Sequence, residues 1–65
     1  ENWVENLSLR EAINRLNQRE RHIIDLRFYE GKTQMEVAQE IGISQAQVSR
    51  LEKNALKTMR NYLRA

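Results

Sequence analysis

The sequence predicts an all-α fold, a four-helix domain with a C-terminal helix-turn-helix. Three observations predict it. The 65 residues include no Pro and only two Gly, no segment alternates apolar and polar residues as a half-buried strand does, and apolar residues recur at helical spacing. A chain of this length makes one domain. We therefore expect residues 1–65 to be a single module. Because the sequence begins at Glu1, we also expect this module to be part of a larger protein.

The first helix is expected around residues 8–16. Its apolar stripe, at positions i, i+3, i+4 and i+7, consists of Leu9, Ala12, Ile13 and Leu16. Ser8 and Glu11 have the S-x-x-E spacing of a capping box. Trp3, Val4 and Leu7 precede this stripe and suggest an earlier helix start. Two interpretations stay open for these three residues: they complete the core, or they form an apolar surface that a partner helix covers.

Two further helices follow, each with its own start and stop signals. Asn17 and Glu20 have the spacing of a capping box, and Gly31 suits the left-handed position after a helix end. The apolar residues between them are Ile23, Ile24, Leu26 and Phe28. Thr33 and Glu36 repeat the capping box and open a short third helix. Its apolar residues are Val37, Ala38 and Ile41.

A tight turn, Gly42-Ile43-Ser44, joins the third helix to a long fourth one. Helices joined by a short turn containing Gly cross steeply, as in the DNA-binding helix-turn-helix. Ala38 is small where the helices approach, Gly42 tolerates positive φ, and Ser44 caps the fourth helix. Ile41, Ile43, Val48 and Leu51 supply the shared core. An ordinary helical hairpin is the plainer interpretation, but the small, Gly, cap and apolar positions all coincide with a helix-turn-helix.

The charge of the chain is unevenly divided. The net charge is +2 and the isoelectric point is about 9.4. Residues 44–65 carry five Lys or Arg against one acid, a net +4, whereas residues 1–43 carry six against eight, a net −2. The five cations, spaced three or four apart on one helix face, are Arg50, Lys53, Lys57, Arg60 and Arg64. A solvated face is the alternative interpretation, but the position on the helix that would enter a major groove favours contact with nucleic acid.

The residue inventory argues against several function classes. Without Cys, and with one His, the chain has no disulfide, no thiolate and no structural zinc site. We find no nucleophile–base pair and no phosphate-binding Gly-rich loop, so we expect neither an enzyme nor a cofactor. No apolar run approaches the roughly 18–20 residues of a membrane span. We therefore expect no membrane partner.

The chain resembles region 4 of bacterial sigma factors over almost its whole length. Within that family it is most similar to the sporulation type, first the late forespore factors (sigma-G) and then the early forespore factors (sigma-F). The matching motifs are Leu16-x-x-Arg19-Glu20-x-x-Ile23-Ile24-x-Leu26-Arg27-Phe28, Gly31-x-Thr33-x-x-Glu36-Val37-Ala38 and Ile43-Ser44-x-x-x-Val48-x-x-Leu51-Glu52-x-x-Ala55-Leu56.

The resemblance implies recognition of the double-stranded promoter −35 element in the major groove and docking on the β-flap of RNA polymerase core. It also implies transcription initiation, of sporulation genes for the types named, in the bacterial cytoplasm or forespore, with an anti-sigma factor as a further partner. The base-facing positions are Gln45, Ala46, Ser49 and Arg50. Housekeeping factors carry several charges where Gln45, Ala46 and Ser49 are neutral, so we expect a different −35 preference.

A second set of residues is expected at the DNA backbone. The resemblance assigns Arg19, Arg27, Thr33 and Gln34 to it. Surface charges paired within the domain are the less favoured alternative for Arg19 and Arg27. From their positions we add Lys32, Lys53 and Lys57, the last two because they lie further from the start of the fourth helix.

Two other interpretations stay open. The output domain of a response-regulator-type activator also has four helices and a Leu-x-x-Arg-Glu start, but Leu26-Arg27-Phe28 and the tail from Leu51 to Leu56 are sigma-like. A protein-interaction module with a vestigial helix-turn-helix would lack the salt-dependent duplex affinity of a DNA-binding domain.

Overall fold

The computed structural model of the chain describes residues 7–64, and the side chain of Leu7 is outside that description. The elements are α1 (Leu7–Asn14), α2 (Gln18–Ile24), the π-helical turn η2 (Asp25–Tyr29), α3 (Gln34–Ile41) and α4 (Gln45–Arg64). The predicted four-helix, all-α architecture is confirmed. Trp3 and Val4, whose role was left open, lie outside the described residues.

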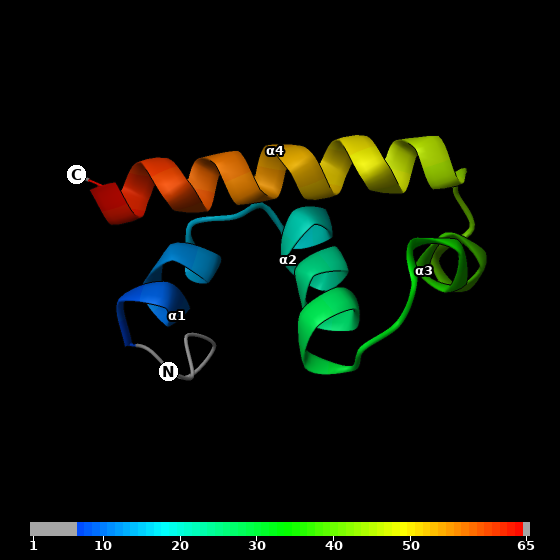
Figure 1. The fold of residues 1–65 in the computed structure, drawn as a ribbon, viewed down its shortest axis with the longest axis horizontal. Helices are drawn as coiled ribbons and strands as arrows, with labels where there is room; N and C mark the ends of the chain where they lie inside the picture. The colour runs from blue at the N-terminus through cyan, green and yellow to red at the C-terminus, as the bar shows by residue number, and fades with distance from the viewer. Residues whose placement is uncertain (1–6, 65) are drawn as a thin grey trace.

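Helix α4 is the axis on which the other helices assemble. Its 20 residues span roughly 30 Å at 1.5 Å per residue, close to the 32 Å long axis of the molecule. Figure 1 shows α1, α2 and α3 arranged along one side of α4, with α3 seen end-on near the start of α4. The steep crossing expected of a helix-turn-helix is therefore present.

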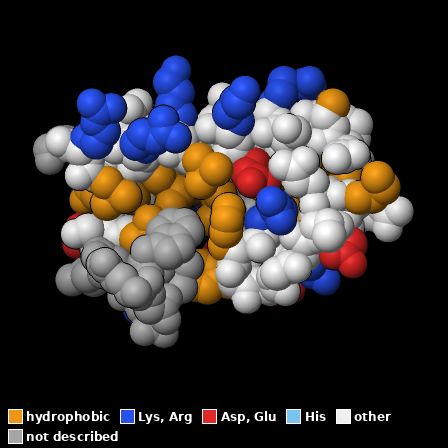
Figure 2. Space-filling view, viewed as in Figure 1, with side chains coloured by type: hydrophobic (Ala, Val, Ile, Leu, Met, Phe, Trp, Pro, Cys, Tyr) orange, Lys and Arg blue, Asp and Glu red, His pale blue; other side chains and the backbone are white. Residues whose placement is uncertain are grey.

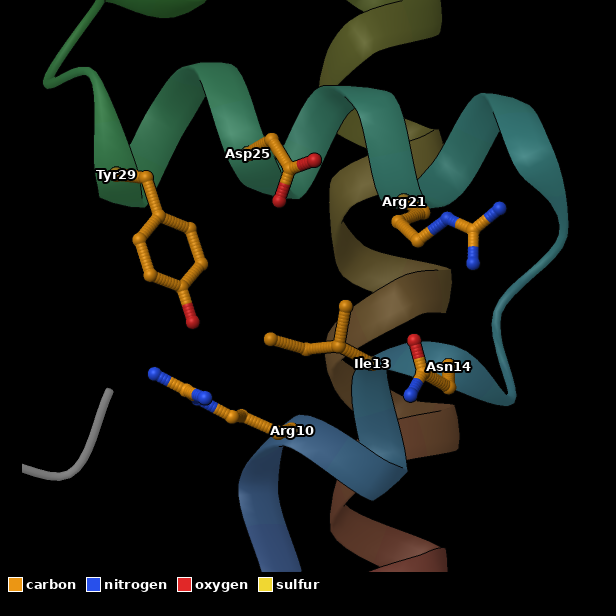
Figure 3. A pocket seen from close by; sticks show the side chains of 6 residues that line it. All are labelled: Arg10, Ile13, Asn14, Arg21, Asp25 and Tyr29. Carbon is orange, nitrogen blue, oxygen red and sulfur yellow. The ribbon is translucent and has the colours of Figure 1, made fainter. Parts of the chain in front are cut away.

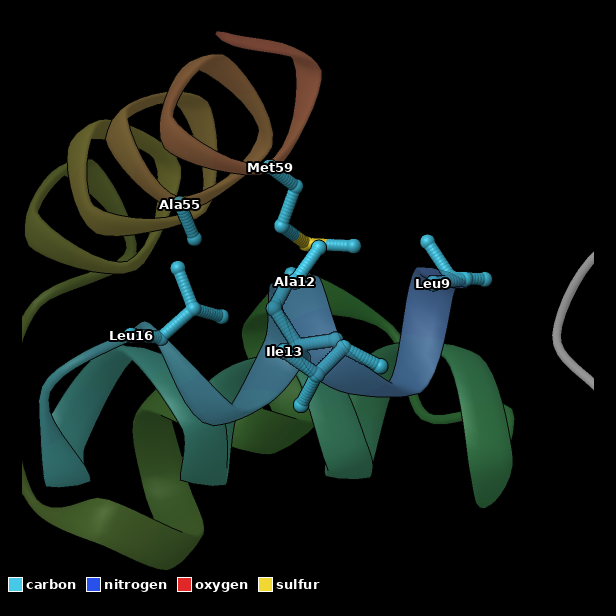
Figure 4. Packing of buried hydrophobic residues seen from close by; sticks show 7 residues of the cluster. Leu9, Ala12, Ile13, Leu16, Ala55 and Met59 are labelled. Carbon is cyan, nitrogen blue, oxygen red and sulfur yellow. The ribbon is translucent and has the colours of Figure 1, made fainter. Parts of the chain in front are cut away.

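One apolar cluster joins α1 and α2 to the C-terminal half of α4. It consists of Leu9, Ala12, Ile13, Leu16, Ile24, Ala55 and Met59, and Phe28, Leu56 and Tyr62 pack against it. Figure 4 shows the α1 side chains of this cluster facing Ala55 and Met59 of α4. The predicted stripe of the first helix is thus buried. Leu16 lies beyond the end of α1, yet it is buried with the stripe, because the chain turns inward through the bonds from the N–H of Arg15 and of Leu16 to the carbonyls of Ala12 and Ile13.

A second cluster joins α2 to the helix-turn-helix. It consists of Ile23, Leu26, Val37, Ala38 and Val48, and Ile41, Ile43 and Leu51 pack against it. Segment α2–η2 therefore serves both clusters, with Ile23 and Leu26 on one side and Ile24 and Phe28 on the other. This division holds α3 and the start of α4 as one unit at one end of the molecule.

The helix starts agree with the capping-box prediction at two of three positions. Asn17 with Glu20, and Thr33 with Glu36, form reciprocal capping boxes. Ser8 is not an N-cap, because α1 already includes Leu7. Glu11 instead accepts a hydrogen bond from the hydroxyl of Tyr62, 51 residues away, at 3.1 Å.

The π-helical turn was not predicted. It extends α2 by five residues and is closed by the bond from the N–H of Glu30 to the carbonyl of Asp25, at 3.1 Å. Single π turns occur inside helices, frequently at functional sites. Within this turn, Leu26 belongs to the second cluster and Phe28 packs against the first. Arg27 lies between these two residues in the sequence.

Candidate nucleic-acid interface

The turn between α3 and α4 has the backbone geometry that the sequence predicted. Gly42 adopts φ +87° and ψ +35°, the left-handed region, and Gly31 after η2 also has positive φ, +73°. The carbonyl of Ala38 accepts bonds from the N–H groups of Gly42 (2.8 Å) and Ile43 (3.1 Å). These two bonds end α3 and redirect the chain within three residues.

Helix α4 starts with a reciprocal cap of its own. The backbone N–H of Gln47 donates to Oγ of Ser44 at 3.1 Å, and the N–H of Ser44 donates to Oε1 of Gln47 at 3.2 Å. The S-x-x-Q spacing is a capping-box signal that the sequence analysis did not use. The side chain of Gln47 is therefore bent back over the start of α4.

The predicted base-facing residues lie on the exposed start of α4. They are Gln45, Ala46, Ser49 and Arg50, and all four are exposed. Short or amide-bearing side chains and one Arg at the N-terminal end of such a helix can reach base edges in the major groove.

The cations of α4 form a stripe on the side facing away from both apolar clusters. All five residues, Arg50, Lys53, Lys57, Arg60 and Arg64, are exposed, and Figure 2 shows Lys and Arg side chains along the outer edge of α4. The opposite face is buried at Val48, Ala55 and Met59. One side of α4 thus packs and the other presents positive charge along the helix.

The residues predicted at the DNA backbone divide into two groups in the structure. Arg19, Thr33, Lys53 and Lys57 are exposed. Lys32 is half-buried and forms an ion pair with Glu40 (3.6 Å between Nζ and Oε1). Arg27 and Gln34 are half-buried, and their side chains bind inside the domain.

Arg19 is brought next to the start of α4. A depression of about 210 Å³ is lined by Arg19, Gln47, Arg50, Leu51 and Asn54. Arg19, which is expected at a phosphate, and Arg50, which is expected at a base, therefore line the same depression. Asn54 was missed by the sequence analysis, although it follows Arg50 by four residues and so lies on the same helix face.

Glu52 is the second residue that was missed. It is 8% exposed and is the one buried charged side chain among residues 8–64. Its Oε1 accepts from Nε of Arg27 at 2.7 Å and from Nε2 of Gln34 at 3.1 Å, and its Oε2 accepts from NH2 of Arg27 at 3.4 Å. The available signal was its spacing, four residues after Val48 and three before Ala55, which places an acid on the apolar face of α4.

The first turn of α3 contains the carboxylate whose pKa is shifted. Oε1 of Glu36 accepts the backbone N–H of Thr33 at 2.8 Å, and Oγ1 of Thr33 accepts the N–H of Glu36 at 3.1 Å. The backbone bond from Thr33 lowers the pKa of Glu36 from its ordinary value of 4.5, desolvation acts in the opposite direction, and the Thr33 hydroxyl and the charge of Lys32 add to the lowering.

Another depression lies between α1 and the α2–η2 segment, and no helix-turn-helix residue lines it. About 400 Å³ in volume, it is lined by Arg10, Ile13, Asn14, Arg21, Asp25 and Tyr29 (Figure 3). Within residues 7–64, no three His, Cys, Asp or Glu side chains are grouped so that they could hold a metal ion. No helix of that part of the chain is both long and apolar enough to cross a bilayer.

Comparison with known proteins agrees with the helix-turn-helix geometry. The family described as sigma-70, region 4, matches residues 12–61. RNA polymerase sigma-G factor of Clostridium acetobutylicum is 59% identical over 63 residues (97% of this chain, 24% of the relative). Sigma-G factor of Bacillus subtilis is 67% identical over 57 residues (88% and 22%), and sigma-F factor of Bacillus licheniformis is 52% identical over 63 (97% and 25%).

The chain thus spans about a quarter of the length of the curated relatives it matches. A search of solved structures gave no significant match. These similarities favour the sigma-factor interpretation over the response-regulator alternative and confirm the resemblance to the sporulation type. The chain belongs to the sigma-70 region 4 family.

Proposed function

We propose that the chain acts as region 4 of a longer sigma factor, binding the promoter −35 element with the start of α4 in the major groove and so directing transcription initiation. One observation carries this proposal. The exposed, mostly uncharged start of α4 follows the left-handed turn at Gly42 and is continued by a stripe of exposed cations. That combination supplies base-edge contacts at one end and phosphate contacts beside them.

The residues have distinct roles in this complex. Gln45, Ala46, Ser49 and Arg50 face the bases. Arg19, Thr33, Lys53 and Lys57 face phosphates in this proposal, because all four side chains are exposed. Lys32 reaches a phosphate only by leaving its ion pair with Glu40 at the surface of the domain, which costs little because surface pairs contribute roughly 0–1 kcal/mol.

Gln34 keeps its expected place at the DNA backbone in this proposal. Its side-chain amide donates to Glu52. Gln34 is also the first residue of α3, where backbone N–H groups have no partner inside the helix. We assign the main chain rather than the side chain of Gln34 to the DNA backbone.

The β-flap of RNA polymerase core docks at the other end of α4 in this proposal. A groove of about 300 Å³ is lined by Leu9, Leu56, Met59, Arg60, Leu63 and Arg64. Leu63 is 45% exposed there. An apolar helix face from a partner fits a groove of this kind, and an anti-sigma factor would compete for it. The identities with sigma-G and sigma-F factors support a role at sporulation promoters.

Selection of duplexes from a randomised pool tests DNA recognition. We expect the wild-type chain to enrich one short sequence, to bind it more tightly than a scrambled duplex of equal composition, and to lose affinity for both as salt rises. Gel filtration on the selected duplex should give one chain per site, whereas an activator output domain would dimerise. Absence of duplex affinity even at low salt would show a protein-interaction module instead.

Binding to RNA polymerase core tests the groove. Leu63→Ser should weaken binding to the core enzyme and leave the affinity for the selected duplex unchanged, because the groove lies away from the start of α4. Leu63→Met keeps an apolar side chain and serves as the matched control. Equal core binding by the Ser and Met variants would remove Leu63 from the docking surface.

A further inference from the structure

We propose that Arg27, Glu52 and Gln34 form a positioning cluster that sets the angle between α3 and α4, so that Arg27 acts on DNA recognition through Glu52 and not through a phosphate. The inference rests on the proposed DNA-binding function. It changes the role of Arg27 that the sequence resemblance implied.

Burial of Glu52 is the first step of the argument. Along α4, Val48 belongs to the second apolar cluster and Ala55 to the first, and Glu52 lies between them. An apolar side chain would satisfy the packing at this position, and desolvation of a carboxylate is unfavourable. The carboxylate is retained with three donated hydrogen bonds from side chains of two other elements. The cluster therefore provides directional contacts where the two apolar clusters meet.

Arg27 is the second step. Besides its two bonds to Glu52, its NH1 donates to the carbonyl of Lys32 at 2.9 Å. One planar guanidinium thus joins η2, the segment that leads into α3, and the middle of α4. The side chain is 27% exposed, and each of its three nitrogens makes a bond inside the domain. This geometry is that of a fixed fork, whose function a Lys ammonium cannot reproduce.

Gln34 completes the geometry. It is the first residue of α3, and its amide reaches Glu52 at 3.1 Å. The last residue of α3, Ile41, directly precedes the turn at Gly42 that leads to α4. Helix α3 is therefore attached to α4 at both ends, by the covalent turn at one and by the cluster at the other. Two attachments fix a crossing angle that apolar packing, which is non-directional, leaves less determined.

The consequence for recognition is geometric. The first turn of α3 presents Thr33 and the backbone at Gln34, and the start of α4 presents Gln45, Ala46, Ser49 and Arg50. These two groups of residues can contact the same duplex only when α3 and α4 cross at one particular angle. Loosening the cluster should therefore reduce discrimination between sequences, because base contacts depend on orientation, and should spare sequence-independent attraction to phosphates.

Two single variants separate this role from a phosphate contact. We measure affinity for the selected duplex and for its scrambled counterpart at several salt concentrations. Arg27→Lys keeps the positive charge but lacks the fork, and Glu52→Gln places an amide NH2 among donors. We expect both variants to lower the ratio of affinity for the selected duplex to affinity for the scrambled duplex roughly tenfold, the size of effect that coupled contacts have. The slope of log affinity against log salt on scrambled DNA should not change. If Arg27 held a phosphate, Arg27→Lys would retain the ratio and Glu52→Gln would not lower affinity for either duplex.

A second readout does not depend on DNA. The chain has no Cys, so spin labels can be attached through Gln39→Cys on α3 and Asn61→Cys on α4, both at exposed positions. We expect a narrow distance distribution in the wild-type background and a broadened one with Arg27→Lys or Glu52→Gln. An unchanged distribution in both variants would overturn the positioning role whether or not DNA binds. A wild-type chain that enriches no duplex would refute the proposed function and leave this readout to decide the positioning role.

Controls and a fallback complete the design. Arg21→Lys and Glu30→Gln make the same chemical changes at exposed positions and should alter neither readout. If a single variant fails to fold by circular dichroism, the double variant Arg27→Met/Glu52→Leu replaces the ion pair by apolar contacts, which proteins often tolerate. If the cluster positions α3 and α4, the folded double variant should have a lower selected-to-scrambled affinity ratio and a broader distance distribution. A wild-type ratio together with a wild-type distribution would contradict the positioning role.

Discussion

Tyr62, in the last turn of α4, donates its hydroxyl to Oε1 of Glu11 in α1 at 3.1 Å. The guanidinium carbon of Arg15 lies 4.6 Å from the centroid of the same ring. These contacts tie the end of α4 to α1, while the ring itself packs against the first apolar cluster. The C-terminal end of α4 is therefore held by a polar and an apolar contact at once.

Truncation at Tyr62 should separate these two contributions. Tyr62→Phe removes only the hydrogen bond and should lower the free energy of unfolding by about 0.5–1 kcal/mol. Tyr62→Ala also removes ring burial and the contact with Arg15, and should cost roughly 2 kcal/mol or more. Urea denaturation measures both values. Equal losses in the two variants would mean that the ring contributes nothing.

Substitution of Gly42 should destabilise the helix-turn-helix through the backbone alone. A Cβ at this position would meet no atom within 4 Å, so the cost comes from φ +87°. Gly42→Ala should lower the free energy of unfolding by about 1–2 kcal/mol, Gly42→Val by more because a β-branched residue tolerates positive φ least, and Gly42→Asn by less. Thermal unfolding checks the order, and an unaltered Tm for Gly42→Val would contradict the turn geometry.

Removal of the Arg50 guanidinium should reduce sequence discrimination. We expect Arg50→Ala to weaken binding to the selected duplex by about 1–3 kcal/mol, with a smaller loss on scrambled DNA. Fluorescence anisotropy on both duplexes gives the ratio. Arg10→Ala, which removes an exposed cation from α1, should leave the ratio unchanged. A preserved ratio in Arg50→Ala would exclude base contact by this residue.

Lys53 should behave as a phosphate contact. Lys53→Ala should weaken binding about equally on every sequence and reduce the slope of log affinity against log salt by about 1. Lys53→Arg, which keeps the charge, should restore the slope. A loss confined to the selected duplex would instead indicate that Lys53 reads a base.

Acid should weaken the cap of α3. The pKa of Glu36 is lowered in the folded chain, chiefly by the backbone hydrogen bond from Thr33. A carboxylate with a depressed folded pKa contributes stability that is present above its unfolded pKa and is lost as pH falls through the folded value. Glu36→Gln should therefore cost more stability at pH 7 than below pH 4. Denaturant unfolding at both pH values tests this, and an equal cost at both would show that the charge of Glu36 is not used.

Much of this structure follows from interactions within four residues along the chain. The caps at Asn17 and Thr33, the positive φ of Gly42 and the cation stripe of α4 all depend on local spacing, and the sequence alone predicted each of them. The start of α1 was less determined, because Ser8 and Glu11 have capping spacing while the helix already includes Leu7.

Contacts between distant residues were decided by the tertiary structure. Arg27 and Glu52 are 25 residues apart, and Gln34 and Glu52 are 18 apart. In the sequence Glu52 is one acid in a basic segment, and its role becomes visible only when α4 packs with that position between the two clusters. The same packing brings Arg19 beside Arg50 and Asn54. The sequence by itself thus determined the helices, the turn and the charged face through local spacing. Tertiary packing decided which cations remain exposed to solvent, because a buried carboxylate requires a partner and packing places Arg27 next to Glu52.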